Sequence, residues 1–335
     1  MRAQEKILIV GLGLIGRQRL DACLDFGIKP EDITAFDVKL SEISFVGESS
    51  YKDIFFVDDL KIALSNEINR AIVAVPHDIA VPLVNSLLDA GIRVLLEKPL
   101  GRNIYEAQEL ASHSNAECLS VGFNYRFMPG IATLKAALEN GTLGDISTIR
   151  MELGHGGSPK DKESWKLDPV KAGGGVLLDP GIHLIDLLVY LFNATQENVD
   201  IAGKTVWKGF WNTGIEESSN LIGYVNLIPF HLASSIVAWR TRFKIEVIGT
   251  ERYIEIDGRG RSDGPQILIE GPRWGWLTST TQKSSESHSE LSEKDESLVA
   301  ETFAWLSGNA SVCNIKQALQ GMEIHSRIME SPDEH

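Results

Sequence analysis

Residues 6–27, KILIVGLGLIGRQRLDACLDFG, decide the fold of this chain. The apolar run Lys6–Val10 predicts a buried strand, and Leu14–Phe26 carries apolar residues at helical spacing. Between them, Gly11-Leu12-Gly13-Leu14-Ile15-Gly16 spells GxGxxG and joins the strand directly to the helix. Such a junction is typical of the turn that holds the pyrophosphate of a dinucleotide at a helix N-terminus.

The three glycines have separate roles in a turn of this kind. Gly11 permits the tight bend, Gly13 lets the pyrophosphate approach backbone N–H groups, and Gly16 allows the helix to pack closely on the strand. Leu14 and Ile15 complete the first helical turn, so we expect all five residues to border the cofactor. The alternative is that the glycines only close a tight turn.

The second predicted strand carries the residue that selects the cofactor. It ends in Asp37, twenty-one residues after Gly16, where a carboxylate accepts hydrogen bonds from the adenosine ribose hydroxyls. A 2′-phosphate would be repelled by this carboxylate, and Lys39 offsets that repulsion only in part. The sequence therefore predicts NAD as the cofactor, with NADP less favoured.

The first 123 residues alternate strands with helices, as a parallel sheet with crossover helices requires. The predicted strands are 6–10, 33–37, 54–57, 71–75, 93–96 and 119–123, and the helices are 14–26, 59–65, 79–90 and 104–113. We therefore predict an α/β fold whose residues 1–123 form a Rossmann domain, a doubly wound parallel sheet that binds the dinucleotide.

The rhythm changes in residues 124–335, which we predict to be a second domain of α+β type. Helices are expected at 130–138 and 181–192, and strands at 146–153, 205–210, 218–226, 231–239, 243–248 and 252–256. Because no helices separate the later strands, they indicate an antiparallel sheet. Two helices, 297–306 and 315–329, close the chain, and the last is expected to pack back on the first domain. The polar segment 278–294 is predicted to be a loop.

Composition excludes several classes of function. A net charge of −14 argues against nucleic-acid binding, which needs a broad positive face. The first apolar run is too short and too interrupted by glycine to cross a membrane or direct export. Three separated cysteines, Cys23, Cys118 and Cys313, form no CxxC metal pattern and favour a reducing compartment. We expect a cytoplasmic protein with no metal and no membrane or nucleic-acid partner.

Five further motifs carry a resemblance to a known family. They are Ala74-Val75-Pro76, Glu97-Lys98-Pro99, Asn124-Tyr125-Arg126-Phe127-Met128-Pro129, Gly141-Thr142-Leu143-Gly144, and residues 173–186, GGGVLLDPGIHLID. With the glycine turn, they stand in the order that Gfo/Idh/MocA oxidoreductases show, over roughly residues 5–255. The resemblance implies a C-terminal domain built on an open antiparallel sheet that commonly forms oligomer contacts, hence a homodimer or homotetramer.

The resemblance also implies the catalytic residues Lys98, Asp179 and His183. Residues four apart share a helix face, so Asp179 and His183 would converge if helical geometry already holds at Asp179. Histidine, with an unperturbed pKa of ~6.5, suits proton abstraction, and a lysine can stabilise the reacting oxygen. Asp179 either orients the substrate or imidazole or takes the proton itself. The alternatives are a solvated lysine, a structural histidine and an aspartate that caps the helix.

Other site residues are expected around this set. Val75, Pro76, His77 and Glu97 are expected near the cofactor together with Lys98. The family often has a histidine where this chain has Ala80, a departure that concerns cofactor contacts rather than chemistry.

Tyr125, Arg126 and Trp165 are expected to bind substrate; the alternative for Arg126 is an ion pair on the surface or between the domains. The arginines and tryptophans of 258–276 suit a phosphate-bearing nucleotide sugar; the alternative is an irregular hairpin with packed tryptophans.

These residues predict an NAD-dependent dehydrogenase or reductase acting on a hydroxyl-bearing carbon of a sugar, cyclitol or nucleotide sugar. Two other functions fit the same resemblance: an NAD-dependent glycosidase, in which oxidation is transient, and a dinucleotide-binding regulator without catalysis. Such regulators can lack the lysine or histidine, whereas Lys98, Asp179 and His183 are all present here. Fold alone does not separate these functions.

Overall fold

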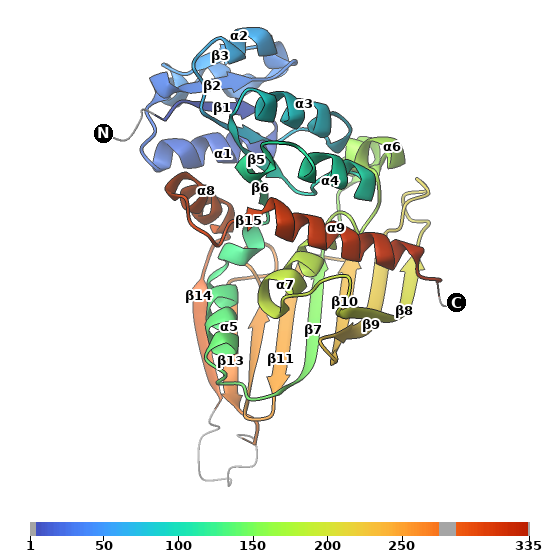
Figure 1. Cartoon of the computed structure of the whole chain (residues 1–335). Coiled ribbons are helices and arrows are strands. Elements are labelled where there is room, and N and C mark those ends of the chain that lie inside the picture. The colour runs from blue at the N-terminus through green and yellow to red at the C-terminus, as the bar shows by residue number, and fades with distance from the viewer. Residues whose placement is uncertain (1–4, 275–285, 334–335) are drawn as a thin grey trace. The chain divides into compact units, whose positions relative to one another are not determined.

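A computed structural model describes residues 5–274 and 286–333 (Figure 1). The chain divides into two compact units, the first of Met1–Asn124 with Leu298–Leu319 and the second of Tyr125–Ser297 with Gln320–His335. The first unit therefore takes in a segment, Leu298–Leu319, that lies within the predicted second domain.

The first unit is built on a seven-stranded sheet with the strand order β15-β6-β5-β4-β1-β2-β3. Six strands are parallel, and only β15 runs antiparallel to its neighbour β6. The strands are β1 (Ile7–Val10), β2 (Ile33–Phe36), β3 (Phe55–Val57), β4 (Arg70–Val73), β5 (Arg93–Glu97), β6 (Leu119–Gly122) and β15 (Cys313–Asn314). The order 3-2-1-4-5-6 confirms the predicted Rossmann sheet.

The helices of this unit follow the strands as predicted. They are α1 (Leu14–Asp25), α2 (Leu60–Leu64), α3 (His77–Asp89), α4 (Ile104–Ala111) and α8 (Ser297–Ser307). Strand β1 is buried at every residue, because helices cover a parallel sheet on both faces. The order in which strands are added to the sheet reverses between the parallel neighbours β1 and β4. Ligands are therefore expected outside the carboxyl ends of these two strands.

The second unit contains an eight-stranded sheet with the order β14-β13-β12-β11-β7-β10-β9-β8. Its strands are β7 (Ile146–Gly154), β8 (Val199–Trp207), β9 (Ser218–Val225), β10 (Ile228–Ser235), β11 (Arg242–Gly249), β12 (Arg252–Asp257), β13 (Gln266–Pro272) and β14 (Ser287–Ser292). The sheet is antiparallel except between β7 and β10, which are parallel neighbours. The predicted antiparallel sheet is thus mixed at its centre, where a long connection through two helices and two strands joins β7 to β10.

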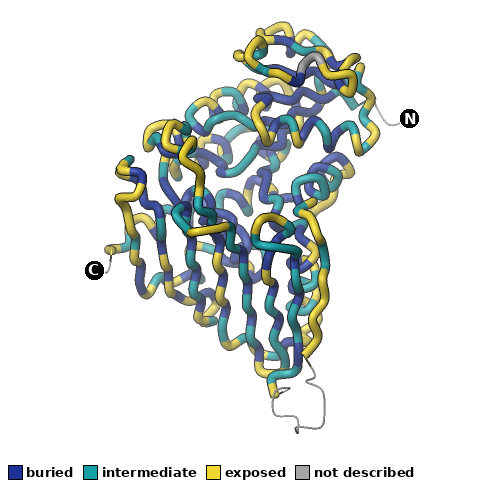
Figure 2. The backbone as a smooth tube through the Cα atoms, turned by 180° about the vertical axis from the view of Figure 1, so that it is seen from behind, coloured by how far each residue is buried: buried dark blue, intermediate teal, exposed yellow. Residues whose placement is uncertain are grey.

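One face of this sheet carries helices and the other does not. Figure 1 shows α5 (Pro129–Glu139) and α7 (Ile182–Phe192) over one face of the sheet. Figure 2 shows the opposite face, where the described strands are uncovered. Burial alternates along β11, as expected for a strand that packs on one side only. The remaining α-helices of the described chain are α6 (Pro169–Ala172), which is short, and α9 (Ile315–Glu330), which is long.

Several boundaries in the second unit differ from the prediction. Strand β8 begins at Val199 rather than residue 205, and β10 covers 228–235 rather than 231–239. Strand β13 was not predicted. Residues 278–285 of the predicted loop 278–294 lie outside the described residues. The described remainder of that loop contains the edge strand β14. Strand β14 is mostly exposed and its residues are polar, so the composition of this segment did not indicate a strand.

Candidate functional site

The glycine turn has the geometry that a dinucleotide requires. Gly11 has a φ of +87°, and a Cβ at this position would lie 2.4 Å from the carbonyl oxygen of Ala74. A Cβ on Gly16 would lie 1.8 Å from the Gly11 carbonyl oxygen, which confirms that close packing excludes a side chain there. A Cβ on Gly13 would meet no atom within 4 Å, so the turn is open on that side.

The beginning of α1 offers groups that a diphosphate would satisfy. Gly13 is the N-cap and supplies no side-chain acceptor for the first helical N–H groups. Leu14 and Ile15, the first two helical residues, are 74% and 37% exposed although both are large and apolar. Exposed N–H groups at a positive helix end, beside an open glycine, fit a bound pyrophosphate.

Asp37 lies against the same turn. Its Oδ2 accepts a 2.8 Å hydrogen bond from the Leu12 N–H, and its Oδ1 accepts one of 2.8 Å from the Lys39 N–H. Each carboxylate oxygen has a further lone pair that a ribose hydroxyl can use. The ammonium of Lys39 lies 3.5 Å from Glu42, so its charge is already partly balanced. This geometry favours NAD over NADP.

The loop between β4 and α3 borders the glycine turn. The Cγ1 of Val75 would lie 3.0 Å from a Cβ on Gly11, and Pro76 is the N-cap of α3. His77, the first residue of α3, is buried, as is Ala80 one turn later. Val75 therefore lies beside the predicted cofactor turn, whereas the His77 side chain is enclosed by protein.

Glu97 and Lys98 follow from the end of β5. Arg19 on α1, which is fully buried, contacts Glu97 through Nε at 2.8 Å and Nη2 at 2.6 Å. The same guanidinium donates to Glu301 and Thr302 of α8, at 2.5 and 2.8 Å. Lys98 comes next in sequence and is joined to Pro99 by a cis peptide bond. The backbone that carries Lys98 is thus attached to the helix that begins at the glycine turn.

Sequence reasoning missed Arg19 and Glu301. Arg19 lies on the buried side of α1 together with Ala22 and Cys23, three and four residues later. An arginine on the apolar stripe of a helix is the signal that indicates a buried ionic partner. The sequence does not identify that partner, because Glu301 comes 282 residues after Arg19.

Asp179 lies outside α7, contrary to one condition of the prediction. The helix begins at Ile182 with Gly181 as its N-cap, whereas the Asp179 N–H bonds to the Gly175 carbonyl oxygen in the preceding turn. Asp179 and His183 therefore do not share a helix face through i,i+4 spacing. Asp179 is not the cap, and Pro180, which follows it through a cis peptide bond, is not in the first helical turn.

The Asp179 carboxylate forms an ion pair with Lys166. The Nζ of Lys166 lies 2.9 Å from Oδ2 of Asp179 and 6.0 Å from the ring centre of Trp165. Trp165, expected in the substrate site, is therefore close to Asp179 through Lys166. The Asp179 side chain retains 21% exposure, so a ligand can reach it.

His183 lies at the start of α7 and stacks on Tyr125. Their ring centres are 4.1 Å apart and the planes differ by 10°. Both residues are buried, and Phe243 of β11 packs edge-on against Tyr125 at 5.5 Å. The structure thus places Tyr125 and His183, two of the residues expected to contact substrate, against each other within the second unit.

Arg126 has a different position from the one expected of a substrate residue. Its Nε and Nη2 bond to the two carboxylate oxygens of Asp186 at 2.9 and 2.6 Å, and its guanidinium lies over the Tyr190 ring. Both charged side chains are almost completely buried. Arg126 thus forms an ion pair, as in the alternative prediction, but the pair is buried within one unit rather than lying on the surface or between domains.

The catalytic residues expected from the resemblance belong to different units. Lys98 is in the first unit, and Asp179 and His183 are in the second. Their convergence on one substrate stays a prediction.

Among the arginine and tryptophan residues of 258–276, Trp274 is 62% exposed rather than packed, Arg259 is buried, and Gly275 and Trp276 lie outside the described residues.

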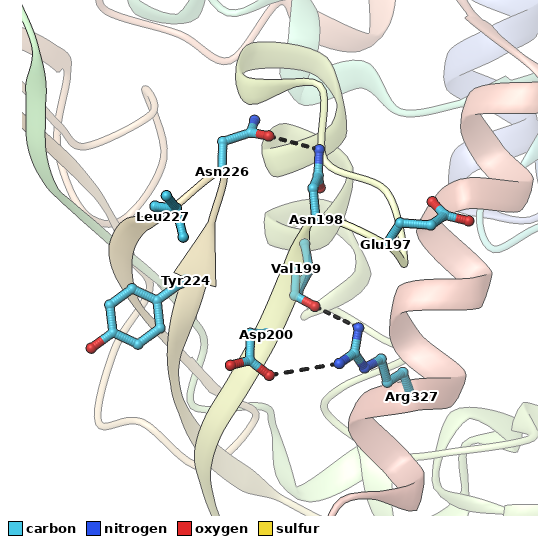
Figure 3. A pocket seen from close by; sticks show the side chains of 8 residues that line it. All are labelled: Glu197, Asn198, Val199, Asp200, Tyr224, Asn226, Leu227 and Arg327. Carbon is cyan, nitrogen blue, oxygen red and sulfur yellow. Dashed lines mark hydrogen bonds and ion pairs between the residues drawn. The ribbon is translucent and has the colours of Figure 1, made fainter.

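A cavity of about 600 Å³ lies elsewhere in the second unit (Figure 3). Figure 3 shows it at the ends of β8 and β9, where Asn198 bonds to Asn226 at 2.9 Å and Arg327 of α9 bonds to the Val199 carbonyl oxygen at 2.6 Å. None of the predicted site residues lines it. This cavity is therefore separate from the residues that the sequence predicts to be functional.

Two further observations concern only residues 5–274 and 286–333. No group of three or more His, Cys, Asp or Glu side chains there is arranged to hold a metal ion. No helix there has both the length and the hydropathy needed to cross a bilayer.

Comparison with protein families gives two matches that adjoin along the chain. Residues 5–124 match the model of an oxidoreductase family with an NAD-binding Rossmann fold, GFO/IDH/MocA. Residues 131–255 match the model of a GFO/IDH/MocA C-terminal domain.

Individual proteins agree with these matches. The chain is 32% identical over 308 residues to glucose-6-phosphate 3-dehydrogenase of Bacillus subtilis (strain 168), covering 82% of this chain and 85% of that enzyme. It is 30% identical over 166 residues to trans-1,2-dihydrobenzene-1,2-diol dehydrogenase of Mus musculus. That match covers 48% of this chain and 47% of the relative, so the chain spans about half the length of that relative.

Among solved structures, a levoglucosan dehydrogenase in complex with NADH and levoglucosan has a TM-score of 0.80 at 17% identity, with 98% of this chain and 96% of that chain covered. At that identity the likeness concerns the fold. With its two family matches, its Rossmann sheet and its open glycine turn, the chain belongs to the GFO/IDH/MocA family of NAD-binding oxidoreductases.

Proposed function

We propose that this enzyme transfers a hydride between NAD and a hydroxyl-bearing carbon of a sugar, cyclitol or nucleotide sugar, with Lys98, Asp179 and His183 as catalytic residues. The observation that carries the proposal is the contact between Arg19 and Glu97. Since α1 begins at the glycine turn and Lys98 follows Glu97, this contact fixes the lysine backbone relative to the cofactor turn.

The bound nicotinamide supplies the hydride acceptor in this reaction. Lys98 holds the reacting oxygen through its Nζ and stabilises the negative charge that develops there as the proton leaves. A preorganised cation of this kind acts most strongly where water is excluded. The catalytic role of Lys98 therefore depends on its backbone staying in place.

His183 receives the hydroxyl proton on its imidazole in this proposal. The ring is held by its stack on Tyr125, which limits its rotation and gives it one orientation toward a substrate. Asp179 orients a neighbouring substrate hydroxyl, and Lys166 supplies its counter-charge. In this proposal an aromatic stack positions His183, and an ion pair positions Asp179.

The names of relatives support the proposed substrate class. Both the Bacillus subtilis relative and the structurally similar levoglucosan dehydrogenase are named for the oxidation of sugars. The first aligns with most of this chain, including the segment that contains Asp179 and His183. These names support a sugar-like substrate for the present enzyme.

An NAD-reduction screen tests the proposal. Sugars, cyclitols, sugar phosphates and nucleotide sugars are offered with NAD, and the formation of NADH is followed for the wild type, Lys98→Met and His183→Ala. We expect both variants to lose at least roughly 100-fold in kcat/KM. Wild-type kcat/KM in both variants would remove the catalytic assignment, and glycoside hydrolysis without net NADH would replace the dehydrogenase with a glycosidase.

We also propose a homodimer or homotetramer in a reducing, cytoplasmic environment. Trp207, Ile222 and Tyr224 lie on the open face of the sheet and are each 45% exposed or more, which suits contact with a second copy. Cys23, Cys118 and Cys313 are free thiols. Burial raises the pKa of the Cys23 thiol to about 12, so this cysteine is unreactive.

A further inference from the structure

Four arginines are buried in the described part of the chain, and three of them have the same kind of partner. The edge of a guanidinium formed by Nε and Nη2 matches the two oxygens of a carboxylate or phosphate. The carboxylates that occupy this edge are Glu97 on Arg19 (2.8 and 2.6 Å), Glu5 on Arg70 (2.5 and 3.0 Å) and Asp186 on Arg126 (2.9 and 2.6 Å). A carboxylate in this position is therefore the rule for buried arginines in this fold.

Arg259 is the exception. It is as buried as Arg70, with 8% exposure for each residue. Its Nη1 donates to the hydroxyl oxygen of Tyr125, whereas Nε and Nη2 donate no hydrogen bond to any described residue. Asp263, in the same loop, acts on Arg259 only at longer range, because neither of its buried carboxylate oxygens has a hydrogen-bond partner in the described chain.

The charge of Arg259 is only partly compensated. Burial, followed by repulsion from Arg261, lowers the pKa of Arg259 from its ordinary value. A buried charge without a close counter-ion destabilises a fold, and groups perturbed by burial and neighbouring charge cluster at functional sites. Arg261, two residues later, is half-exposed and is already paired with Asp295 at 2.8 Å. The two arginines of one loop thus differ in whether a described carboxylate lies at hydrogen-bond distance from the guanidinium.

The loop holds Arg259 in place. Gly258 and Gly260 on either side have φ angles of +74° and +75°, which other residues rarely adopt. A Cβ on Gly260 would lie 2.3 Å from the Lys294 backbone, so this side of the loop is packed against the chain before α8. Arg259 is therefore presented from a fixed backbone, as a binding residue must be.

Arg259 is also close to the proposed catalytic base. Its guanidinium carbon lies 5.5 Å from the Tyr125 ring centre, and that ring stacks on His183 at 4.1 Å. A single aromatic ring thus separates the guanidinium from the imidazole. A substrate whose reacting carbon lies at His183 has its more distant substituents within reach of Arg259.

We propose that the Nε and Nη2 edge of Arg259, which no described carboxylate occupies, binds an oxyanion of the substrate, a phosphate or a carboxylate, so that the enzyme acts on anionic sugars in preference to neutral ones. The inference rests on the proposed function, because it takes His183 to mark the reacting carbon. Arg259 is then the residue that sets substrate charge, and Tyr125 fixes its distance from the reaction.

A kinetic comparison tests the assignment. Arg259→Gln removes the charge and the two-pronged edge, and Arg261→Gln is the matched control in the same loop. The substrates are a hexose, its 6-phosphate, its uronic acid and its nucleotide diphosphate derivative, all with saturating NAD. We expect Arg259→Gln to lower kcat/KM for the preferred anionic substrate roughly 100-fold, at least tenfold more than for the hexose, and Arg261→Gln to change neither.

The anionic substrate with the largest loss identifies the source of the oxyanion, phosphate or carboxylate. An equal loss on charged and neutral substrates, or no loss on either, overturns the role of Arg259. Arg259→Lys keeps the charge without the paired edge and is expected to lie between the wild type and Arg259→Gln. A wild type that oxidises only neutral sugars overturns this inference while leaving the proposed function in place.

A binding measurement separates this inference from catalysis. Inorganic phosphate is added to the enzyme with NAD at saturation, so that the glycine turn is already filled, and the melting temperature is recorded. We expect phosphate to raise the melting temperature of the wild type and Arg261→Gln but not of Arg259→Gln. Equal protection of all three proteins contradicts the site, even if no substrate is found and the proposed function fails. NAD affinity and an unchanged melting temperature without phosphate show that Arg259→Gln folds.

Discussion

Arg19 on α1 donates a 2.5 Å hydrogen bond from Nη2 to Oε2 of Glu301 on α8, and both side chains are completely buried. Burial alone would lower the pKa of Arg19, but Glu97 and Glu301 raise it above its ordinary value. One cation thus joins the helix at the cofactor turn, the end of β5 and a helix from the C-terminal part of the chain. This arrangement makes the ion cluster a structural centre of the first unit.

Replacing Glu301 with Gln is expected to destabilise the protein. The substitution leaves a buried cation with one carboxylate fewer, and breaking a buried pair costs about 3 kcal/mol or more. Urea unfolding at pH 7 measures the change. The control is Glu67→Gln, which removes an exposed partner of Lys6 in the same unit and is expected to cost less than about 1 kcal/mol. Equal effects of the two substitutions contradict a special role for the buried cluster.

Asp37→Ala is expected to weaken NAD binding while leaving NADP binding unchanged or improved. The substitution removes the ribose acceptor and the repulsion of a 2′-phosphate, so KM for NAD rises by roughly tenfold. KM values for both cofactors measure the effect. Lys39→Ala is the control and is expected to change little, because Lys39 is paired with Glu42. An unchanged ratio between the two cofactors after Asp37→Ala removes Asp37 from the ribose site.

Lys166→Ala is expected to lower activity without affecting NAD binding. The variant removes the counter-charge of Asp179 and the cation next to Trp165, and we expect kcat/KM to fall roughly tenfold. Steady-state kinetics and NAD titration provide the two readouts. Lys171→Ala, which removes a looser partner of Asp168 at 4.0 Å, serves as the control. A parallel loss in both variants indicates a general effect on this segment instead.

Stability is expected to fall as the pH is lowered from 6.5 to 4, with His325 of α9 as one cause. Burial, followed by repulsion from Lys204, lowers the pKa of His325 to about 4. The unfolded chain, with a histidine pKa of ~6.5, then binds more protons than the folded chain in this range, which costs up to about 1.4 kcal/mol per pH unit. Urea unfolding at pH 7 and pH 5 measures the loss. His325→Gln should lose less stability over this interval, and an equal loss excludes His325.

The open sheet face predicts the oligomeric state. Ile222→Glu places a charge among the exposed apolar residues of β8 and β9 and is expected to shift the protein toward a smaller species. Light scattering at working concentration reports the mass. Glu139→Lys on α5, over the covered face, is the control and should leave the mass unchanged. A wild type that is already monomeric contradicts the proposed assembly.

The Rossmann half could be predicted from the sequence because its signals are local. Each strand from β1 to β6 is a short apolar run, and the helices between them repeat apolar residues every three or four positions. Gly11, Gly16 and Asp37 follow a pattern whose physical reasons are known, and the structure gives each the expected surroundings. Strand β15 was missed, since two residues carry no periodicity.

The second unit was predicted less well because its pattern is set by tertiary packing. The edge strand β14 is exposed and polar, so nothing in its composition distinguishes it from a loop. The start of α7 was predicted to within one residue, whereas the sequence left open whether helical geometry already holds at Asp179, and the structure places Asp179 in the preceding turn. The pairing of Lys166 with Asp179, and the burial of Arg259 without a carboxylate, depend on contacts between residues distant in sequence.

The composition of the first unit from two distant segments has a consequence for synthesis on the ribosome. When residue 124 has been made, the sheet still lacks β15, and Arg19 has Glu97 but neither Glu301 nor Thr302. Domains usually fold in the order in which they emerge, whereas this one must wait until Tyr125–Ser297 of the other unit and then its own segment Leu298–Leu319 have been translated. Until then Arg19 has one of its two carboxylate partners, so the nascent first unit lacks part of its buried ion cluster.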